Sequence, residues 1–336
     1  MALWAGCAGV ASSRQTVLTI SSMSGSKNSS LRVAFQGEHG AFSEAAAIQL
    51  LGESITAVPR ATFDSAFRAI AEGAAEALLA PVENSLAGSV VRVYDLLLES
   101  NLEIVAEIIL PIEHHLIGCP GATLDGLQSV ASHPMALAQC ERFFLSHPRL
   151  KRVPAEDTAG SVRDVLASGN KSAAGIAGRQ AATRYGGAIL AESIQDNAEN
   201  FTRFVLLIPV HREGAVDPLH SPIATSPAVT DLMRELPARL AERSQRPPSL
   251  KLSLALRLAH KPGALLAALE PFAHHGINLL KIESRPIHGT PWEYQFFLDV
   301  QTDAPTQLEA ALNELRSATS FLRILGRYPP ALDASA

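Results

Sequence analysis

Residues 102–118 read LEIVAEIILPIEHHLIG, a long extended segment that interrupts an otherwise regular alternation of strands and helices. Short strands alternate with helices before it, from residue 31, and after it, from residue 128, which indicates mostly parallel sheets. Two such sets joined through one long segment predict two lobes with a cleft between them. Ligands of such folds bind beyond the carboxyl ends of the strands and between lobes, so this is where chemistry is expected.

The predicted elements follow from short apolar runs separated by turn and capping residues. In the first set, strands are expected over residues 31–35, 55–59 and 76–85, and helices over 43–51, 62–73 and 90–98. In the second set, strands are expected over 128–134, 150–156, 172–177, 188–194 and 202–210, and helices over 134–145, 158–168 and 178–186. Ser43, Thr62 and Asp157 are expected to cap their helices, because short polar side chains accept hydrogen bonds from the first free amides.

The end of the chain has a different pattern. Residues 211–249 are rich in proline, serine and threonine and predict a linker, with a short helix over 229–243. Beyond it, the order βαββαβ is typical of a ferredoxin-like plait. Its strands are expected over 250–258, 277–286, 292–300 and 321–328, and its helices over 263–275 and 305–318. Helical spacing predicts that these helices bury Leu265, Leu269, Phe272 and Ala273 in the first, and Leu308, Leu312 and Leu315 in the second.

Composition narrows the possible function classes. Hydrophobic residues make up 47% of the 336 residues, and no apolar run has the roughly eighteen residues that span a bilayer, so no membrane segment is expected. A net charge of -5 without a basic run argues against nucleic acid. Cys7, Cys119 and Cys140 lie far apart, which indicates neither disulfides nor zinc and fits a reducing, cytoplasmic setting. Residues 1–30 predict a disordered tail or an extended start, with a weak transit peptide as the alternative.

Three polar clusters fall at the ends of predicted strands. GEHGAFSE at 37–44 combines glycines with a helix N-terminus near Ser43, which suits a carboxylate or phosphate. PVENSLAG at 81–88 presents Asn84 and Ser85, an amide beside a hydroxyl. Thr158 opens a helix of the second lobe. Each cluster taken alone also fits a turn or a helix cap.

His114 and His115 are candidates for acid–base work because histidine titrates near neutrality. Adjacent residues of an extended segment point to opposite faces, so at most one of them is expected to face the cleft. The sequence has no metal-ligand spacing, nucleophile elbow, dinucleotide fingerprint or phosphate-binding loop. A metal is therefore not expected, and the common nucleophile, dinucleotide and nucleotide interpretations lose their main support.

Thr202 and Arg203 stand at the mouth of the last strand of the second set, in ENFTRFVLL at 199–207. That position lies near the hinge of a two-lobed fold, so side chains there can face both lobes. Arg203 offers a positive fork for a dianion, and Thr202 could donate a hydrogen bond to a leaving oxygen. Because a threonine hydroxyl is a poor acid in water, this role requires a good leaving group and a dry site.

Together these motifs resemble one family, the prephenate dehydratases and the closely related arogenate dehydratases. The matching pieces, in chain order, are VAFQGEHGAFSEAAA, PVENSLAGSV, HHLIG, SHPMALAQCERF, DTAGSV and NFTRF. The plait resembles an ACT regulatory domain through KPGAL at 261–265 and GINLLKIESRP at 276–286. A departure is Phe42, where the family usually has a tyrosine.

The resemblance implies an α/β fold with a two-lobed, periplasmic-binding-protein-like catalytic domain over 31–210, a linker over 211–249 and a C-terminal ferredoxin-like βαββαβ ACT domain over 250–328. It implies decarboxylating dehydration of prephenate to phenylpyruvate in phenylalanine biosynthesis, without a metal or redox cofactor. Thr202 matches the proton donor to the departing hydroxyl. The residues expected to bind the substrate are Ser43, Asn84, Ser85, Thr158 and Arg203.

The resemblance also implies feedback regulation by phenylalanine, in a homodimer or homotetramer with the effector pocket at a contact between two plaits. The residues expected to bind the effector are Gly263, Ala264, Leu265, Asn278, Glu283, Ser284, Arg285 and Pro286. Three alternatives stay open: a plait used only for dimerisation, a non-catalytic amino-acid sensor, and an arogenate dehydratase that forms phenylalanine directly. Stretches such as SHPMALAQCE fit the arogenate-preferring branch as well as the prephenate branch.

Overall fold

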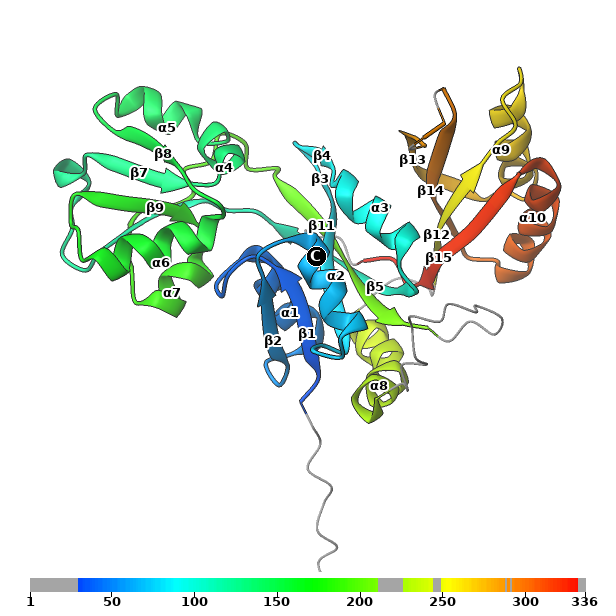
Figure 1. Cartoon of the computed structure of the whole chain (residues 1–336), viewed down its shortest axis with the longest axis horizontal. Coiled ribbons are helices and arrows are strands. Elements are labelled where there is room, and N and C mark those ends of the chain that lie inside the picture. The colour runs from blue at the N-terminus through cyan, green and yellow to red at the C-terminus, as the bar shows by residue number, and fades with distance from the viewer. Residues whose placement is uncertain (1–29, 211–225, 244–248, 288, 291, 332–336) are drawn as a thin grey trace, which may run out of the picture.

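The computed structural model describes residues 30–210, 226–243, 249–287, 289–290 and 292–331. The predicted tail and the proline-rich part of the linker lie outside the described residues. Figure 1 shows a green lobe on the left, a blue and cyan lobe in the middle and a yellow-to-red plait on the right. Within the described ranges, no helix has both the length and the apolar character needed to cross a membrane.

The first lobe, in the middle of Figure 1, is built on strands in the order β5-β11-β3-β1-β2. They are β1 (Arg32–Gln36), β2 (Thr56–Arg60), β3 (Ala77–Asn84), β5 (Leu102–Pro111) and β11 (Phe201–Pro209), with the short β4 (Gly88–Ser89) beside β3. β1 runs parallel to β2 and β3, as predicted. β11 instead runs antiparallel to β3 and β5, because it returns from the other lobe.

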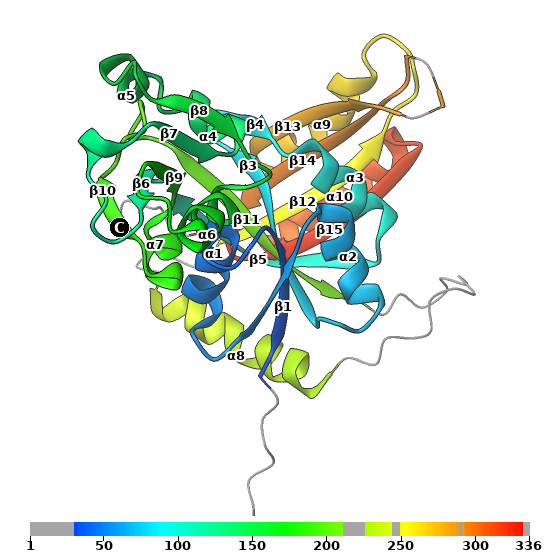
Figure 2. The same ribbon diagram turned by 60° about the vertical axis from the view of Figure 1, so that its left-hand side comes forward.

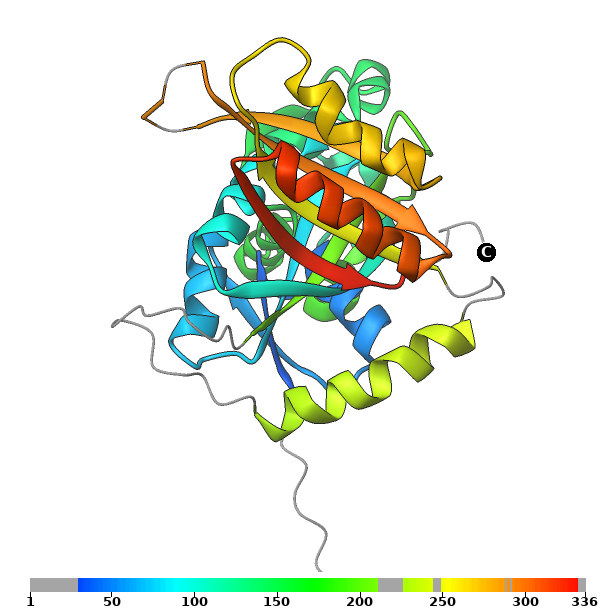
Figure 3. The ribbon, with the colours of Figure 1, turned by 90° about the vertical axis from the view of Figure 1, so that its right-hand side faces the viewer.

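Helices cover both faces of this sheet. α1 (Phe42–Leu51) and α8 (Pro227–Arg243) share one apolar cluster with one set of alternate strand residues, such as Leu79 and Leu206. α2 (Phe63–Ala71) and α3 (Val91–Glu99) share a second cluster with the other set, such as Leu78 and Val205. The helix predicted within the linker is α8, which runs across the lower side of the lobe in Figure 3. This segment is therefore part of the core of the first lobe.

The second lobe has its own sheet, in the order β10-β6-β9-β7-β8. Its strands are β6 (His115–Gly118), β7 (Ser129–Ser132), β8 (Lys151–Pro154), β9 (Ala173–Ala177) and β10 (Ala188–Ala191). Its helices are α4 (Pro134–Ala138), α5 (Glu141–Ser146), α6 (Thr158–Ser168) and α7 (Arg179–Tyr185), with a 3-10 turn at Leu124–Gly126. The segment 102–118 thus leaves the first sheet as β5 and enters the second as β6, which confirms the two-lobed prediction.

The two lobes meet through a shared apolar cluster. Phe35 and Ala41 of the first lobe pack with residues of α6 and α7, among them Ala159 and Ala181. Gly40 has a φ of +84°, and a Cβ on it would lie 2.8 Å from the Cα of Ala181. Only glycine fits there, so the turn before α1 is a point of close contact between the lobes, whose ribbons overlap in the view of Figure 2.

The plait follows the predicted βαββαβ order. Its elements are β12 (Leu250–Arg257), α9 (Ala264–His274), β13 (Asn278–Pro286), β14 (Tyr294–Thr302), α10 (Pro305–Ala318) and β15 (Phe321–Tyr328), with sheet order β13-β14-β12-β15. α9 and α10 cover one face of this sheet, as Figure 3 shows. The other face turns toward the first lobe. β15 pairs with β5 at Gly326 and Ile104, so the two sheets join into one of ten strands.

One detail of the plait core differs from the prediction. α10 buries Leu308, Leu312 and Leu315 as expected. α9, however, buries Ala264, Ala268, Pro271 and Phe272. Leu265 is 36% exposed, and Ala273 is exposed as well. Phe272 is nevertheless buried as predicted, and Leu269 packs partly buried against the same core. The rest of the buried stripe starts one residue earlier than predicted, because the small side chains of Ala264 and Ala268 face the core.

Candidate active site

Thr202 lies on β11 directly opposite Asn84, the last residue of β3. The side-chain nitrogen of Asn84 donates to the hydroxyl oxygen of Thr202 at 3.0 Å and to the side-chain oxygen of Asn200 at 2.7 Å. It also lies 3.1 Å from the main-chain oxygen of Phe201. Thr202 is 8% exposed, so this group is nearly dry. The structure thus brings together two of the side chains that the sequence singled out.

The orientation of the Asn84 amide is fixed by its other end. Its side-chain oxygen accepts hydrogen bonds from the backbone N–H groups of Leu86 (3.0 Å) and Ala87 (2.8 Å). A flipped amide would face two donors with its own NH₂ group, so the nitrogen must face Thr202. Because Thr202 accepts from Asn84, its own hydrogen is left to donate elsewhere. A hydroxyl that accepts a hydrogen bond is polarised and becomes a better donor.

A chain of side-chain hydrogen bonds continues from Asn200 to the second lobe. The Asn200 amide nitrogen donates to the Gln139 side-chain oxygen at 3.2 Å, and His114 Nε2 lies 3.0 Å from the same oxygen. Since this oxygen can only accept, His114 carries its hydrogen on Nε2. Burial lowers the pKa of His114, which is 2% exposed, so its ring is neutral. Its Nδ1 is a buried acceptor without a recorded partner.

Asn200 and Gln139 were missed by the sequence reasoning. Gln139 was hidden because residues 134–145 read as one helix, whereas the structure breaks it into α4 and α5, with Gln139 at the end of α4. The break turns the Gln139 side chain toward the hinge. Asn200 stands directly before the strand in NFTRF, and its closeness to Thr202 was the available signal. The two histidines have separate partners, since the Nδ1 of His115 accepts from the backbone N–H of Ser193.

Ser85 is held by the strand that carries Thr202. Its hydroxyl donates to the backbone oxygen of Glu199 at 3.0 Å and accepts from the backbone N–H of Phe201 at 2.9 Å. Both bonds tie the end of β3 to the start of β11. Thr158 opens α6, where Asp157 is the N-cap and accepts from the Gly160 N–H at 2.6 Å, as predicted.

Ser43 was predicted to cap α1, and the structure shows that it does not. α1 starts at Phe42 with Ala41 as its N-cap residue, and no side chain caps it there. Instead, the Glu44 carboxylate accepts from the Gly40 N–H at 2.5 Å. Ser43 is buried in the first turn of the helix. Thr62 does cap its helix as predicted, in a capping box with Ser65.

Arg203 is placed differently from the expectation that it binds substrate. Side chains alternate along a strand, so Arg203 points to the face of β11 opposite Thr202. Its guanidinium, 10% exposed, contacts three carboxylates: Asp299 at 2.7 Å, Glu107 at 3.0 Å and Glu83 at 3.3 Å. Burial opposes its charge, but these carboxylates outweigh that effect and hold the pKa of Arg203 above its usual range. Its positive charge is therefore already neutralised within the protein.

The expected effector residues lie on the plait but do not all share one face. Gly263, with a φ of +80°, precedes α9, and Ala264 and Leu265 form its first turn. β13 is the edge strand of the sheet. On it, Glu283 points toward the first lobe and accepts from the Ser89 hydroxyl at 2.9 Å. This contact separates Glu283 from the α9 side of the sheet.

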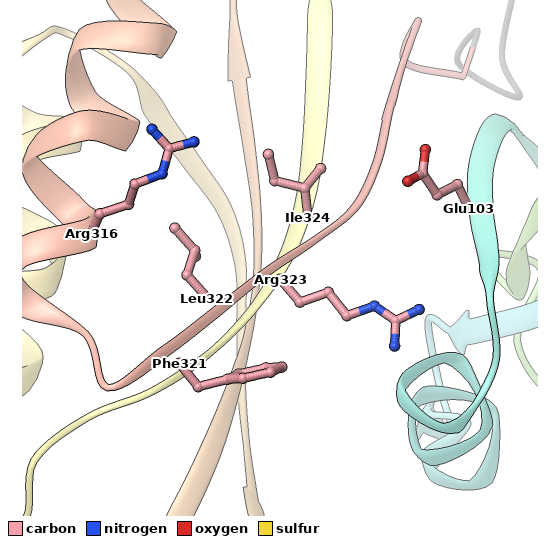
Figure 4. Close-up of a pocket in the computed structure, with 6 residues that line it drawn as sticks. All are labelled: Glu103, Arg316, Phe321, Leu322, Arg323 and Ile324. Atoms are coloured by element: carbon pink, nitrogen blue, oxygen red, sulfur yellow. The ribbon is translucent and has the colours of Figure 1, made fainter. Parts of the chain in front are cut away.

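A pocket of about 460 Å³ lies at the seam between the plait and the first lobe (Figure 4). It is lined by Glu103, Arg316, Phe321, Leu322, Arg323 and Ile324. Arg323 donates to the backbone oxygens of Leu98 (2.6 Å) and Ser100 (2.5 Å) and so caps the end of α3. None of these lining residues belongs to the group around Thr202, so this pocket is separate from the candidate active site.

The family model of prephenate dehydratase matches residues 33–211, which include both Asn84 and Thr202. The chain belongs to the prephenate dehydratase family. The model of the ACT domain matches residues 253–318, the greater part of the plait. The chain is therefore an enzyme of the hydro-lyase class with a C-terminal ACT domain, which removes the non-catalytic sensor from the alternatives.

Individual relatives cover most of the chain. An Arabidopsis thaliana protein named arogenate dehydratase/prephenate dehydratase 1, chloroplastic, is 37% identical over 90% of this chain and 73% of its own length. A solved prephenate dehydratase from Arthrobacter aurescens, in complex with L-Phe, is 29% identical over 89% of each chain, with a TM-score of 0.71. A structure named GqqA, described as a novel type of quorum quenching acylase, is 32% identical over 91% of this chain and 100% of that chain, with a TM-score of 0.73.

Proposed function

We propose that this enzyme is a prephenate dehydratase that converts prephenate to phenylpyruvate, carbon dioxide and water. The electrons of the breaking bond to the carboxylate complete the aromatic ring as the ring C–O bond breaks. Thr202 supplies the hydrogen bond and the proton to the departing oxygen, which leaves as water, and solvent returns the proton to Thr202. The observation that supports this most directly is the fixed Asn84 amide, because it donates to Thr202 and leaves the threonine hydrogen available.

Substrate binding is assigned to polar side chains of both lobes. We assign Asn84, Ser43, Ser85 and Thr158 to binding the substrate, together with Asn200 and Gln139, which complete the hydrogen-bond chain. Arg203 is left out of this set because three carboxylates surround it. Catalysis needs no cofactor in this scheme, since aromatisation drives the departure of the hydroxyl.

Regulation by phenylalanine is part of the proposal. The ACT domain and the L-Phe complex of the Arthrobacter aurescens relative support it. We propose that the turn at Gly263 and the start of α9 bind the effector with Asn278, Ser284, Arg285 and Pro286 of β13, at a contact between two plaits. Glu283 is left out because it contacts Ser89 of the first lobe. A homodimer or homotetramer follows from that arrangement and stays a prediction, as does a location in the cytoplasm. A plait used only for dimerisation would bind no phenylalanine.

Arogenate is the alternative substrate, because relatives bear both names. It differs from prephenate by an amine in place of the keto group, at a distance from the leaving hydroxyl. The deciding experiment is a side-by-side turnover assay of the purified full chain on prephenate and on arogenate, with and without phenylalanine. Formation of phenylpyruvate supports the proposal, formation of phenylalanine from arogenate alone supports the alternative, and no turnover of either refutes both.

Acyl transfer, the reaction class in the name of GqqA, has less support in this chain. A serine or threonine nucleophile needs a base within hydrogen-bond reach of its hydroxyl. Among the described residues, the recorded side-chain partner of Thr202 is the Asn84 amide, which is a donor. His114 directs its Nε2 hydrogen at Gln139. Assaying an N-acyl homoserine lactone beside prephenate compares the two reaction classes directly.

A further inference from the structure

Buried charged side chains form a layer between the first lobe and the plait, on the face of β11 opposite Thr202. Glu107 is 4% exposed, Lys251 6% and Asp299 5%. Charged side chains are rarely buried unless they are paired, because the free-energy cost of removing a charge from water is offset only by an oppositely charged partner. We call this layer the charge layer; it comprises Arg203, Glu83 and Glu107 of the first lobe and Lys251, Lys281 and Asp299 of the plait. Glu83 is its most exposed member, with 38% of its side chain exposed.

Every plait member of the charge layer is paired with a residue of the first lobe. Asp299 accepts from Arg203 at 2.7 Å, and the Lys251 ammonium donates to Glu107 at 2.8 Å. A third pair joins the Lys281 ammonium to Glu83 at 3.0 Å. Each part therefore neutralises charges that the other part buries. Neither half of the charge layer is neutralised by its own part alone. Arg203 is held by Glu83 and Glu107 of its own lobe, and Asp299 of the plait makes the shortest of its three ion pairs.

Asp299 is itself held firmly on the plait. Its second oxygen accepts from the Ser253 hydroxyl at 2.5 Å, and the Ser253 hydroxyl lies 2.6 Å from the Tyr328 hydroxyl. These three residues belong to three neighbouring strands of the plait, β14, β12 and β15. The carboxylate that binds Arg203 therefore has a fixed place in the plait sheet.

The charge layer and the active-site group occupy two successive residue pairs, or rungs, between β11 and β3. β11 and β3 pair Thr202 with Asn84 and, one residue further on, Arg203 with Glu83. The first rung carries the active-site hydrogen bond on one face, and the second carries the charges on the other. The pairing shifts directly after Arg203, at a bulge before Phe204. Arg203 and Thr202 are joined by one peptide bond, so a displacement of Arg203 is passed to Thr202.

We propose that Asp299 and Lys251 of the plait are positioning residues for the reaction, which hold Arg203 and Glu107 so that Thr202 and Asn84 keep their hydrogen bond. The reaction they serve is the proposed dehydration, but the positioning itself is measurable without substrate. The plait is in this view a structural part of the active site and not only a regulatory appendage.

The test compares Asp299→Asn, which keeps the shape but removes the charge, with Asp299→Glu, which keeps the charge. The matched control is Glu309→Gln, which breaks an exposed ion pair with Arg327 on the same plait. Hydrogen exchange of the full chain is followed in peptides covering 82–89 and 201–204, and steady-state kinetics are measured on prephenate and arogenate. In Asp299→Asn, exchange in both peptides should rise at least tenfold and kcat should fall about tenfold, with KM within twofold. Asp299→Glu should recover part of both losses, and Glu309→Gln should match the wild type.

Unchanged exchange in these peptides for Asp299→Asn would overturn the proposal, as would a change in KM alone. If Asp299→Asn does not fold, Ser253→Ala replaces it, because it keeps every charge and removes only the hydroxyl that orients Asp299. It should raise exchange in the same two peptides by a smaller factor, and no rise would count against the proposal. A wild-type protein that turns over neither substrate would refute the proposed function, while the exchange result would still decide the positioning.

Discussion

Replacing Thr202 by valine removes the proposed proton donor with little change of shape. The Asn84 amide has two hydrogens and three acceptors within reach, so in Thr202→Val it still has Asn200 at 2.7 Å and the main-chain oxygen of Phe201 at 3.1 Å. No buried donor is left without a partner, and the unfolding free energy should change by less than about 1 kcal/mol. For a domain of this size, that corresponds to a melting temperature within about 4 °C of the wild type.

The rate should change far more than the stability. Loss of a positioned acid lowers turnover by about two to four powers of ten, or about 2.7–5.4 kcal/mol of transition-state stabilisation. The assay is steady-state formation of phenylpyruvate from prephenate, with Thr202→Ser as the hydroxyl-retaining control, which should keep kcat within about tenfold of the wild type. Turnover above one tenth of wild type in Thr202→Val, in a folded protein, would refute the role of this hydroxyl.

Three further predictions concern the surroundings of Thr202. In Asn84→Asp, the carboxylate should still accept from the backbone N–H groups of Leu86 and Ala87, but it would also accept the Thr202 hydrogen. The value of kcat should therefore fall about a hundredfold without loss of fold. A kcat near the wild-type value would contradict the argument that the Asn84 amide is fixed. Gly40→Ala should lower kcat/KM at least tenfold, because the added Cβ would push α7 away. The control is Gly52→Ala, which is also at positive φ but has open space around it and should lower stability alone. Equal kinetics for the two variants would count against the interlobe contact. Burial lowers the pKa of His114 below its ordinary 6.5, so its contribution to stability is complete above that pH and is lost as the pH falls toward the lowered value. Urea unfolding should therefore show a slope between pH 7 and pH 5 that is shallower in His114→Gln, by up to about 1.4 kcal/mol per pH unit, and equal slopes would argue against a neutral buried ring.

Periodicity made most of the fold predictable. The runs around residues 31–35, 158–168 and 305–318 have regular spacing and clear turn residues, and the structure has strands and helices there. The break at Gln139 was not predictable in this way, because MALAQCERFF has helical spacing throughout. It depends on the hinge, where the Gln139 side chain meets Asn200 and His114 from distant parts of the chain.

The prediction that Thr202 and Asn84 share a site agrees with the structure, whereas the prediction for Arg203 does not. Thr202 lies at the start of β11 and Asn84 at the end of the neighbouring antiparallel strand β3, so the topology of the sheet brings them together. Arg203 was predicted to bind an anionic substrate, but in the structure it pairs with Asp299, almost one hundred residues away in the sequence. In the same way, Lys251 and Ser253 of the strand LKLSLALRL are polar yet buried. Which face of a strand meets another domain depends on docking, which spacing along the strand does not encode.

The junction of the two sheets at Gly326 limits how this protein could exchange parts with others. A Cβ at that position would overlap the main-chain oxygen of Ile104, so any side chain there would force β15 away from β5. A plait transplanted from another protein would need a bare backbone at this one point to dock at all. Chimeras that swap the C-terminal domain should accordingly succeed or fail on the residue that faces Ile104, however similar their ligand preferences.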